Sequence, residues 1–289
     1  RLQAANGNGR YQFWQSALHA NATHPWRGIG PGTFQFWWGQ HATVDGFIRN
    51  AHSLYFETLA ETGIIGFTLL GGLLLWFVGV AVRRALREPP MLRLQLAAAS
   101  ASLAVFLFSA AIEWVWQLAA IAAAALLLGA VIVAGRAEAP QDWDQPQPEV
   151  ETGGLGSRLV PRSVLALLAI AALGAVLVPF AGQLAVRDSQ AAAADGNLAA
   201  ALQDSLAAER LQPYASNAYL QEALVLEAAA DLGPAATAAR IATTNSPTDW
   251  TTWLTLARID ARRGATDAAL AELRRARELN PLSVLFVQT

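Results

Sequence analysis

The chain has 289 residues, of which 54% are hydrophobic and only 15% are charged, and its net charge is −2. Soluble domains usually carry about 25% charged residues, so the composition excludes an ordinary soluble protein and indicates a membrane protein. The absence of cysteine excludes disulfides and thiolate chemistry. Because the sequence opens at Arg1 without a signal peptide, we expect it to be the C-terminal portion of a larger protein.

The first part of the chain is predicted to lie outside the membrane and to contain two helices. One covers about Arg10–Ala20, where apolar residues recur at helical spacing. The other covers about Ala51–Thr62, with Asn50 as its predicted cap and Gly63 as its predicted end. Between them, His24–Phe34 carries three glycines and two prolines, which is typical of a turn-rich loop.

His52 falls in the first turn of the second predicted helix. The positive end of the helix dipole disfavours a protonated imidazole there, so we expect a neutral His52 that can accept a proton from a hydroxyl. A histidine at this position can also simply cap or pack, and periodicity alone slightly favours that plainer role. Glu57 and Glu61 lie four residues apart and are expected to form a solvated helix face.

The segment 1–52 is basic, with four arginines, all four histidines and a single carboxylate, Asp45. Guanidinium groups bind phosphate well, so an anionic partner is predicted, either a substrate phosphate or anionic lipid headgroups. Arg27 and Arg49 are further candidate phosphate ligands, although exposed loop arginines are more often solvated, and Trp14 can offer an apolar face to a ligand or anchor the membrane interface. The histidine spacing does not favour a metal site, so no metal or other cofactor is expected.

Four apolar stretches are predicted to span the membrane. They cover residues 64–82, 95–112, 115–135 and 163–186. The second and third are predicted to form a hairpin that turns at Glu113–Gln117, because a carboxylate in the middle of one long span would be costly.

Arginines cluster after the first span and on both flanks of residues 136–162. Positively charged loops stay on the cytoplasmic side, so both segments are predicted to be cytoplasmic. The stretch 136–162 is rich in proline, glycine and acidic residues and is interpreted as a flexible linker. Alternation of the spans then places residues 1–62, the Glu113–Gln117 turn and everything after residue 187 on the extracytoplasmic side.

Residues 190–289 repeat internally, since Pro213, Pro247 and Pro281 are each 34 residues apart. This period, with small residues where paired helices would touch, resembles tetratricopeptide (TPR) repeats. An alanine-rich helical bundle is the alternative. The sequence therefore predicts an all-α fold: a polytopic helical membrane protein with four spans, followed by a helical repeat domain on the outer side.

One motif carries a family resemblance. In "HSLYFETLAETGIIG", a histidine and a serine are followed after nine residues by a glycine and then by a second glycine, which are His52, Ser53, Gly63 and Gly66. It is preceded by "GRYQFWQSALHANATHPWRGIGPGTF". Together these stretches resemble the O-antigen ligase/polymerase (Wzy-type) superfamily over about residues 9–135, which implies a GT-C-like membrane fold.

The resemblance implies an integral membrane glycosyltransferase. Members of this superfamily transfer a glycan from a polyprenyl-diphosphate carrier to a saccharide, lipid or protein acceptor at the outer face of the bacterial cytoplasmic membrane. They need no metal. By resemblance, His52 matches the essential histidine that activates or orients the acceptor, and Arg10 matches the arginine that engages the diphosphate. Residues 1–62 are then the catalytic loop, and backside attack would invert the anomeric centre.

A second function remains open at this point. The chain could be a non-catalytic membrane anchor that displays the TPR-like tail for protein binding during envelope polysaccharide assembly. Both hypotheses allow a protein partner at the tail and contact with membrane lipid, and neither includes a nucleic acid.

Overall fold

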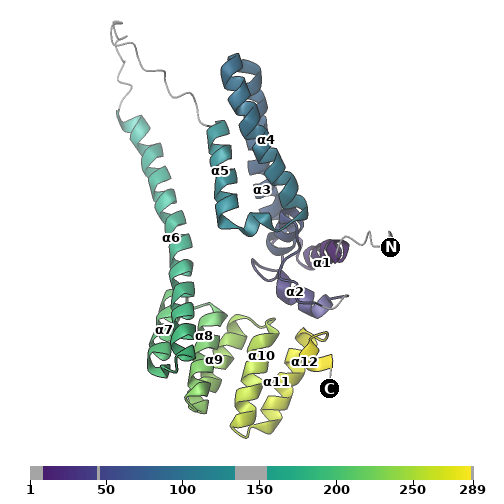
Figure 1. Cartoon of the computed structure of the whole chain (residues 1–289), viewed down its shortest axis with the longest axis vertical. Coiled ribbons are helices and arrows are strands. Elements are labelled where there is room, and N and C mark those ends of the chain that lie inside the picture. The colour runs from purple at the N-terminus through teal and green to yellow at the C-terminus, as the bar shows by residue number, and fades with distance from the viewer. Residues whose placement is uncertain (1–8, 44–45, 134–154, 288–289) are drawn as a thin grey trace. The chain divides into compact units, whose positions relative to one another are not determined.

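The computed structural model describes residues 9–43, 46–133 and 155–287, and every regular element in these ranges is a helix (Figure 1). This confirms the all-α fold class. The chain divides into two compact units, Arg1–Gln141 with Pro281–Thr289, and Asp142–Asn280.

The first unit opens with α1 (Arg10–Thr23) and α2 (Phe34–His41). Helix α1 begins where the periodicity predicts, after Gly9 in a left-handed conformation (φ 83°). Helix α2 was not predicted. It forms because Phe34 and Trp38 lie four residues apart and bury their rings against α1, with Trp38 edge-on to Phe13 at a ring-centroid distance of 5.0 Å.

Helix α3 (Leu54–Arg87) begins later than predicted, because Ser53 rather than Asn50 is its cap. The Ser53 hydroxyl accepts a hydrogen bond from the backbone N–H of Phe56 at 3.5 Å. The predicted helix start was therefore wrong, and His52 lies before the helix instead of in its first turn. The prediction that Glu61 belongs to a solvated helix face was also wrong. The Glu61 side chain accepts hydrogen bonds from the backbone N–H groups of Gly32 (2.8 Å) and Phe34 (3.0 Å).

Gly63 interrupts α3 rather than ending it, with φ 66° and ψ −166°. The interruption leaves backbone groups without helical partners, and the loop between α1 and α2 satisfies them. The loop donates two hydrogen bonds to α3, from Ile29 N–H to Ala60 O (2.9 Å) and from Gly30 N–H to Glu61 O (2.9 Å). It accepts two from α3, from Ile64 N–H to Pro25 O (2.8 Å) and from Ile65 N–H to Trp26 O (3.3 Å). The loop is thereby attached to α3 like a short strand, which explains why a glycine stands at position 63.

Helices α4 (Pro90–Ile112) and α5 (Ala119–Val133) form the predicted hairpin. It turns through Glu113 and a short 3-10 helix, η2 (Val115–Gln117). The three long helices α3, α4 and α5 share a core of apolar side chains: Phe77, Ala99, Leu103, Ala125 and Ile132. Arg84 of α3 donates to the carbonyl of Ile132 at 2.8 Å and so caps the end of α5.

Three helices are long and apolar enough to cross a membrane: Leu54–Arg87, Leu92–Ile112 and Ala169–Ala194. The span predicted at 115–135 contains the turn η2, and over its described residues α5 is only 15 residues long. That is fewer than the roughly 20 residues that a span needs. The described residues thus contain three candidate spans, and the span predicted at 115–135, whose last two residues lie outside them, stays a prediction.

The second unit begins with α6 (Leu155–Ala194), a helix of 40 residues (Figure 1). Most of the predicted linker 136–162 lies outside the described residues, but its last eight residues, 155–162, are helical. Beyond the apolar part of α6, the last turns pack against the following helices. Val186 is buried against Ala208 and Ala218, and Ser189 donates from its hydroxyl to the carbonyl of Ala201 at 2.7 Å.

The remaining helices repeat with a period of 34 residues. They are α7 (Leu198–Leu211), α8 (Ser216–Ala228), α9 (Leu232–Asn245), α10 (Trp250–Arg262), α11 (Thr266–Leu279) and α12 (Val284–Val287). Helices α10 and α11 reproduce the bounds of α8 and α9 at positions 34 higher, and α9 reproduces α7 in the same way. Asn217 of α8 donates to Gln183 of α6, also 34 residues apart, at 3.0 Å. The last turns of α6 therefore contact α8 at an equivalent position, while the start of the repeats at residue 190 and their assignment as TPR repeats stay predictions.

Corresponding turns of this array give a stability prediction. Gly196, Ala230 and Gly264 occupy the same position and all have positive φ, 78°, 60° and 79°. A left-handed alanine costs roughly 1–2 kcal/mol, so we expect Ala230→Gly to stabilise the turn by about 0.5–1 kcal/mol. Thermal unfolding and hydrogen exchange of the α8–α9 turn measure this. The matched variant Gly264→Ala should act in the opposite direction, and equal effects of both variants would contradict the argument.

Candidate active site

Three segments of the first unit meet around His52. They are the N-terminal end of α1 with Arg10, the residues just before α3 with His52, and the turn after α4 with Glu113. The His52 ring stacks on Phe13 of α1, with ring centroids 5.6 Å apart and an interplanar angle of 28°. Arg10 forms an ion pair with Glu113 across 103 positions of sequence. Two of the predicted site residues, Arg10 and His52, are therefore brought to one place.

The backbone at His52 adopts an unusual conformation, with φ 52°. Residues other than glycine enter this region rarely and at an energetic cost, so the surrounding structure must hold it. The His52 N–H donates to the Asn50 side chain at 3.3 Å, and the preceding N–H of Ala51 donates to Glu57 at 2.7 Å. These bonds fix the turn from which the imidazole projects.

Burial lowers the pKa of His52 from its usual 6.5. The carboxylate of Glu113 acts in the opposite direction, and the guanidinium of Arg10 lowers the pKa further. The lowered pKa favours a neutral imidazole, which is the form expected from the sequence. The cause is different, because the prediction relied on a place in the first helical turn that His52 does not occupy.

Arg10 and Glu113 are both accessible, since their side chains are 31% and 37% exposed. An anion from outside can therefore reach the guanidinium and compete with Glu113 for it. Glu113 joins this candidate site through its ion pair with Arg10, whereas sequence reasoning identified it only as part of a turn. Its position as the only charged residue between Leu96 and Gly135 could have indicated a special role from the sequence.

The other predicted site residues make different contacts. Trp14 stacks on Phe56 at 5.3 Å and belongs to the core between α1, α2 and α3. Arg27 and Arg49 are exposed, the first in the loop before α2 and the second just before Asn50. In the described part of the chain, neither arginine has a contact that joins it to Arg10 or His52.

The remaining histidines do not form a metal site. His41 stacks on Trp37 at 3.9 Å, and His24 contacts the hydroxyl of Thr23 at 3.0 Å. Over residues 9–43, 46–133 and 155–287, no group of three or more histidines, cysteines or carboxylates is placed to hold a metal ion. That the reaction needs no metal stays a prediction.

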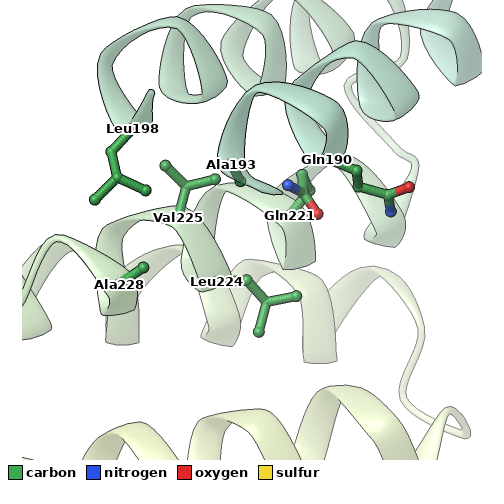
Figure 2. A pocket seen from close by; sticks show the side chains of 7 residues that line it. All are labelled: Gln190, Ala193, Leu198, Gln221, Leu224, Val225 and Ala228. Carbon is green, nitrogen blue, oxygen red and sulfur yellow. The ribbon is translucent and has the colours of Figure 1, made fainter. Parts of the chain in front are cut away.

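A cavity of about 250 Å³ lies in the second unit, between the end of α6, the start of α7 and α8 (Figure 2). Its lining residues are Gln190, Ala193, Leu198, Gln221, Leu224, Val225 and Ala228. The amide of Gln221 donates to the Ser189 hydroxyl at 3.0 Å. No ionisable side chain lines this cavity, so it offers no acid or base for catalysis.

One family model matches part of the first unit. Residues 1–71 match the family model described as O-antigen ligase. No curated protein matches the chain. The matched segment contains Arg10, His52, Gly63 and Gly66, and it supports a membrane protein with a ligase- or polymerase-type, glycosyltransferase-like function. Over residues 1–71, the resemblance of this chain to the O-antigen ligase/polymerase superfamily is thus confirmed.

Proposed function

We propose that this protein transfers a glycan from a polyprenyl-diphosphate carrier to an acceptor hydroxyl at the outer face of the bacterial cytoplasmic membrane. The observation that carries the proposal is the meeting of Arg10 and His52 beside the start of a candidate membrane span. One is an accessible cation and the other an imidazole whose pKa is lowered by burial. Glycosyl transfer from a diphosphate needs both groups.

His52 acts as the general base. Its neutral imidazole accepts the proton of the acceptor hydroxyl while the hydroxyl oxygen forms a bond to the anomeric carbon. The bond from that carbon to the diphosphate oxygen breaks on the opposite face, so the anomeric configuration is inverted. The stacking of the ring on Phe13 restricts its orientation and excludes water from one face.

Arg10 stabilises the leaving diphosphate. Negative charge grows on the leaving group as its bond to the sugar breaks, and a fixed guanidinium is well suited to that charge. Before the donor binds, Glu113 neutralises Arg10. The diphosphate has to replace this carboxylate, which gives Glu113 a role in keeping an empty site from binding other anions.

The distribution of charge along α3 supports an outer location for the site. His52 lies just before the N-terminal end of this helix, and Arg83, Arg84 and Arg87 lie at its C-terminal end. A helix of 34 residues is about 50 Å long, which exceeds the thickness of a bilayer. Because arginine-rich ends stay in the cytoplasm, the His52 end belongs outside.

Substitution of Arg10 tests the proposal. The protein, with any residues that precede Arg1 in its gene, is assayed in membranes with a polyprenyl-diphosphate-linked oligosaccharide and an acceptor glycan. Arg10→Ala should lower the transfer rate about 10²–10³-fold, as loss of a transition-state donor does. Arg10→Lys should retain part of the activity, because lysine keeps the charge but not the bidentate geometry.

Arg27→Ala is the matched control, since Arg27 is an exposed arginine with no described contact to Arg10 or His52, and it should transfer glycan within a few-fold of wild type. If Arg10→Ala is as active as wild type at equal protein level, the proposed function is wrong.

The paired helices of the second unit favour one further role. Helix pairs that repeat every 34 residues expose extended surfaces suited to a protein or acceptor partner. If the protein is a non-catalytic scaffold instead, substitutions at Arg10 and His52 will have no effect on envelope polysaccharide, while removal of the repeat helices will abolish it.

A further inference from the structure

A chain of three hydrogen bonds joins Glu57 to the backbone of His52. Gln117 of η2 donates from its side-chain amide to Glu57 Oε1 at 3.1 Å. Asn50 donates from its side-chain amide to Gln117 Oε1 at 3.1 Å. The His52 N–H donates to Asn50 Oδ1 at 3.3 Å. The chain thus connects the first turn of α3, the turn after α4 and the residue proposed as the base.

The Glu57 end sets the donor-to-acceptor order of these three hydrogen bonds. In its charged form Glu57 can only accept hydrogen bonds, whereas each side-chain amide has one donating and one accepting end. Glu57 therefore forces Gln117 to point its NH₂ group toward α3 and its oxygen toward Asn50. Asn50 in turn must point its NH₂ group toward Gln117 and its oxygen toward the His52 N–H.

Glu57 and Asn50 are withdrawn from water, so the polarity of the hydrogen-bond chain matters at these two members, whereas Gln117 between them is exposed. Glu57 is 5% exposed and Asn50 is 9% exposed. Buried donors that face donors, or acceptors that face acceptors, lose the full desolvation free energy of the group. The second oxygen of Glu57 is also used, because it accepts from the Ala51 N–H at 2.7 Å. Glu57 is therefore not part of a solvated helix face, contrary to the expectation from its spacing.

We infer that Glu57, Gln117 and Asn50 are positioning residues that hold the backbone of His52 in its left-handed conformation and so aim the imidazole at the acceptor. The inference rests on the proposed function for its catalytic meaning. The hydrogen bonds help to hold a conformation (φ 52°) that residues other than glycine adopt rarely. They also tie the orientation of His52 to the turn that carries Glu113.

Exchanging the carboxylate at position 57 with the amide at position 117 gives a direct test. Glu57→Gln places an NH₂ group against the NH₂ group of Gln117. If Gln117 turns over, the same conflict moves to Asn50, and if Asn50 also turns over, the His52 N–H loses its acceptor. In Gln117→Glu, two carboxylates face each other. The double variant Glu57→Gln/Gln117→Glu satisfies every donor and acceptor again, because the amide at position 57 donates to the carboxylate at position 117.

Each single variant is expected to lower kcat by roughly 10- to 100-fold, as a displaced catalytic group does. The KM for the lipid-linked donor should stay within about 3-fold, because Arg10 is unchanged. The double variant should return kcat to within about 5-fold of wild type. Gln15→Glu makes the same chemical change on the exposed side of α1 and serves as the control that leaves kcat unchanged.

Hydrogen exchange at Ala51 and His52 provides a measurement that does not need transfer activity. Both amides should exchange faster in the single variants than in wild type and slow down again in the double variant. Equal protection in all four proteins would overturn the inference, and so would a folded double variant with no recovery. If exchange follows the expected pattern but His52→Ala transfers glycan normally, the positioning of the His52 backbone stands and the proposed function fails.

Discussion

Replacing His52 with alanine is expected to slow glycan transfer about 10²–10⁴-fold, the range that a general base contributes. The structure places the His52 imidazole near Arg10, and burial lowers its pKa and so favours the neutral form. Without it, the acceptor hydroxyl must lose its proton to water while it attacks. The measurement is the rate of transfer from a polyprenyl-diphosphate-linked glycan in membranes matched for protein level.

Two controls separate this chemical role from a structural one. His24→Ala removes an exposed histidine of the same segment and should keep full activity. The pH profile of the wild-type protein supplies the other control. Because burial lowers the pKa of His52 below 6.5, the neutral base predominates above pH 6.5, and the rate should fall as pH drops through the lowered pKa. A rate that already declines above pH 7 on the acid side would contradict this assignment.

Gly63→Ala is expected to have the largest effect on the folded structure. Its φ and ψ of 66° and −166° lie in a region that is essentially restricted to glycine. A Cβ there would also lie 2.5 Å from the carbonyl oxygen of Trp26 and 2.6 Å from the N–H nitrogen of Arg27. We expect a loss of about 3 kcal/mol or more of stability, since backbone strain and a backbone clash combine. The attached loop should separate from α3, and transfer should fall with it.

Gly71→Ala is the matched control, because Gly71 lies in the same helix with open space around its Cβ position. That variant should be neutral or slightly stabilising, since alanine is the better helix former. Thermal unfolding in detergent and hydrogen exchange of Ile29, Gly30, Ile64 and Ile65 measure both variants. If Gly63→Ala unfolds like Gly71→Ala, the interruption of α3 does not depend on glycine.

Local patterns were enough to predict much of the fold. Apolar periodicity located α1, the cost of a buried carboxylate located the turn at Glu113, and the 34-residue period located the helix pairs. Each of these depends on neighbours in sequence or on the membrane as a solvent, so one sequence carries the information. The pairing of Arg10 with His52 could be proposed only through the family motif.

The features that sequence reasoning missed depend on partners far along the chain. Asn50 was predicted as a cap, but its side chain is bound to Gln117, 67 residues away. Glu57 was predicted to face water, but it accepts from Gln117 as well, 60 residues away. Helix α2 has few strong helix formers and is stabilised by aromatic packing on α1. Tertiary contacts decided these positions, and local propensity could not reveal them.

The length of α6 has a mechanical consequence. A tether of irregular chain would let a repeat array turn freely above the bilayer, but here the last turns of an apolar helix are themselves the first layer of the array. A helix resists twisting, and each residue along it corresponds to about 100° of rotation. The rotational orientation of the helix array is therefore set by the rotation of α6 about its own axis. A partner bound to the helix array would therefore be held at a fixed distance from α6 and in a fixed orientation.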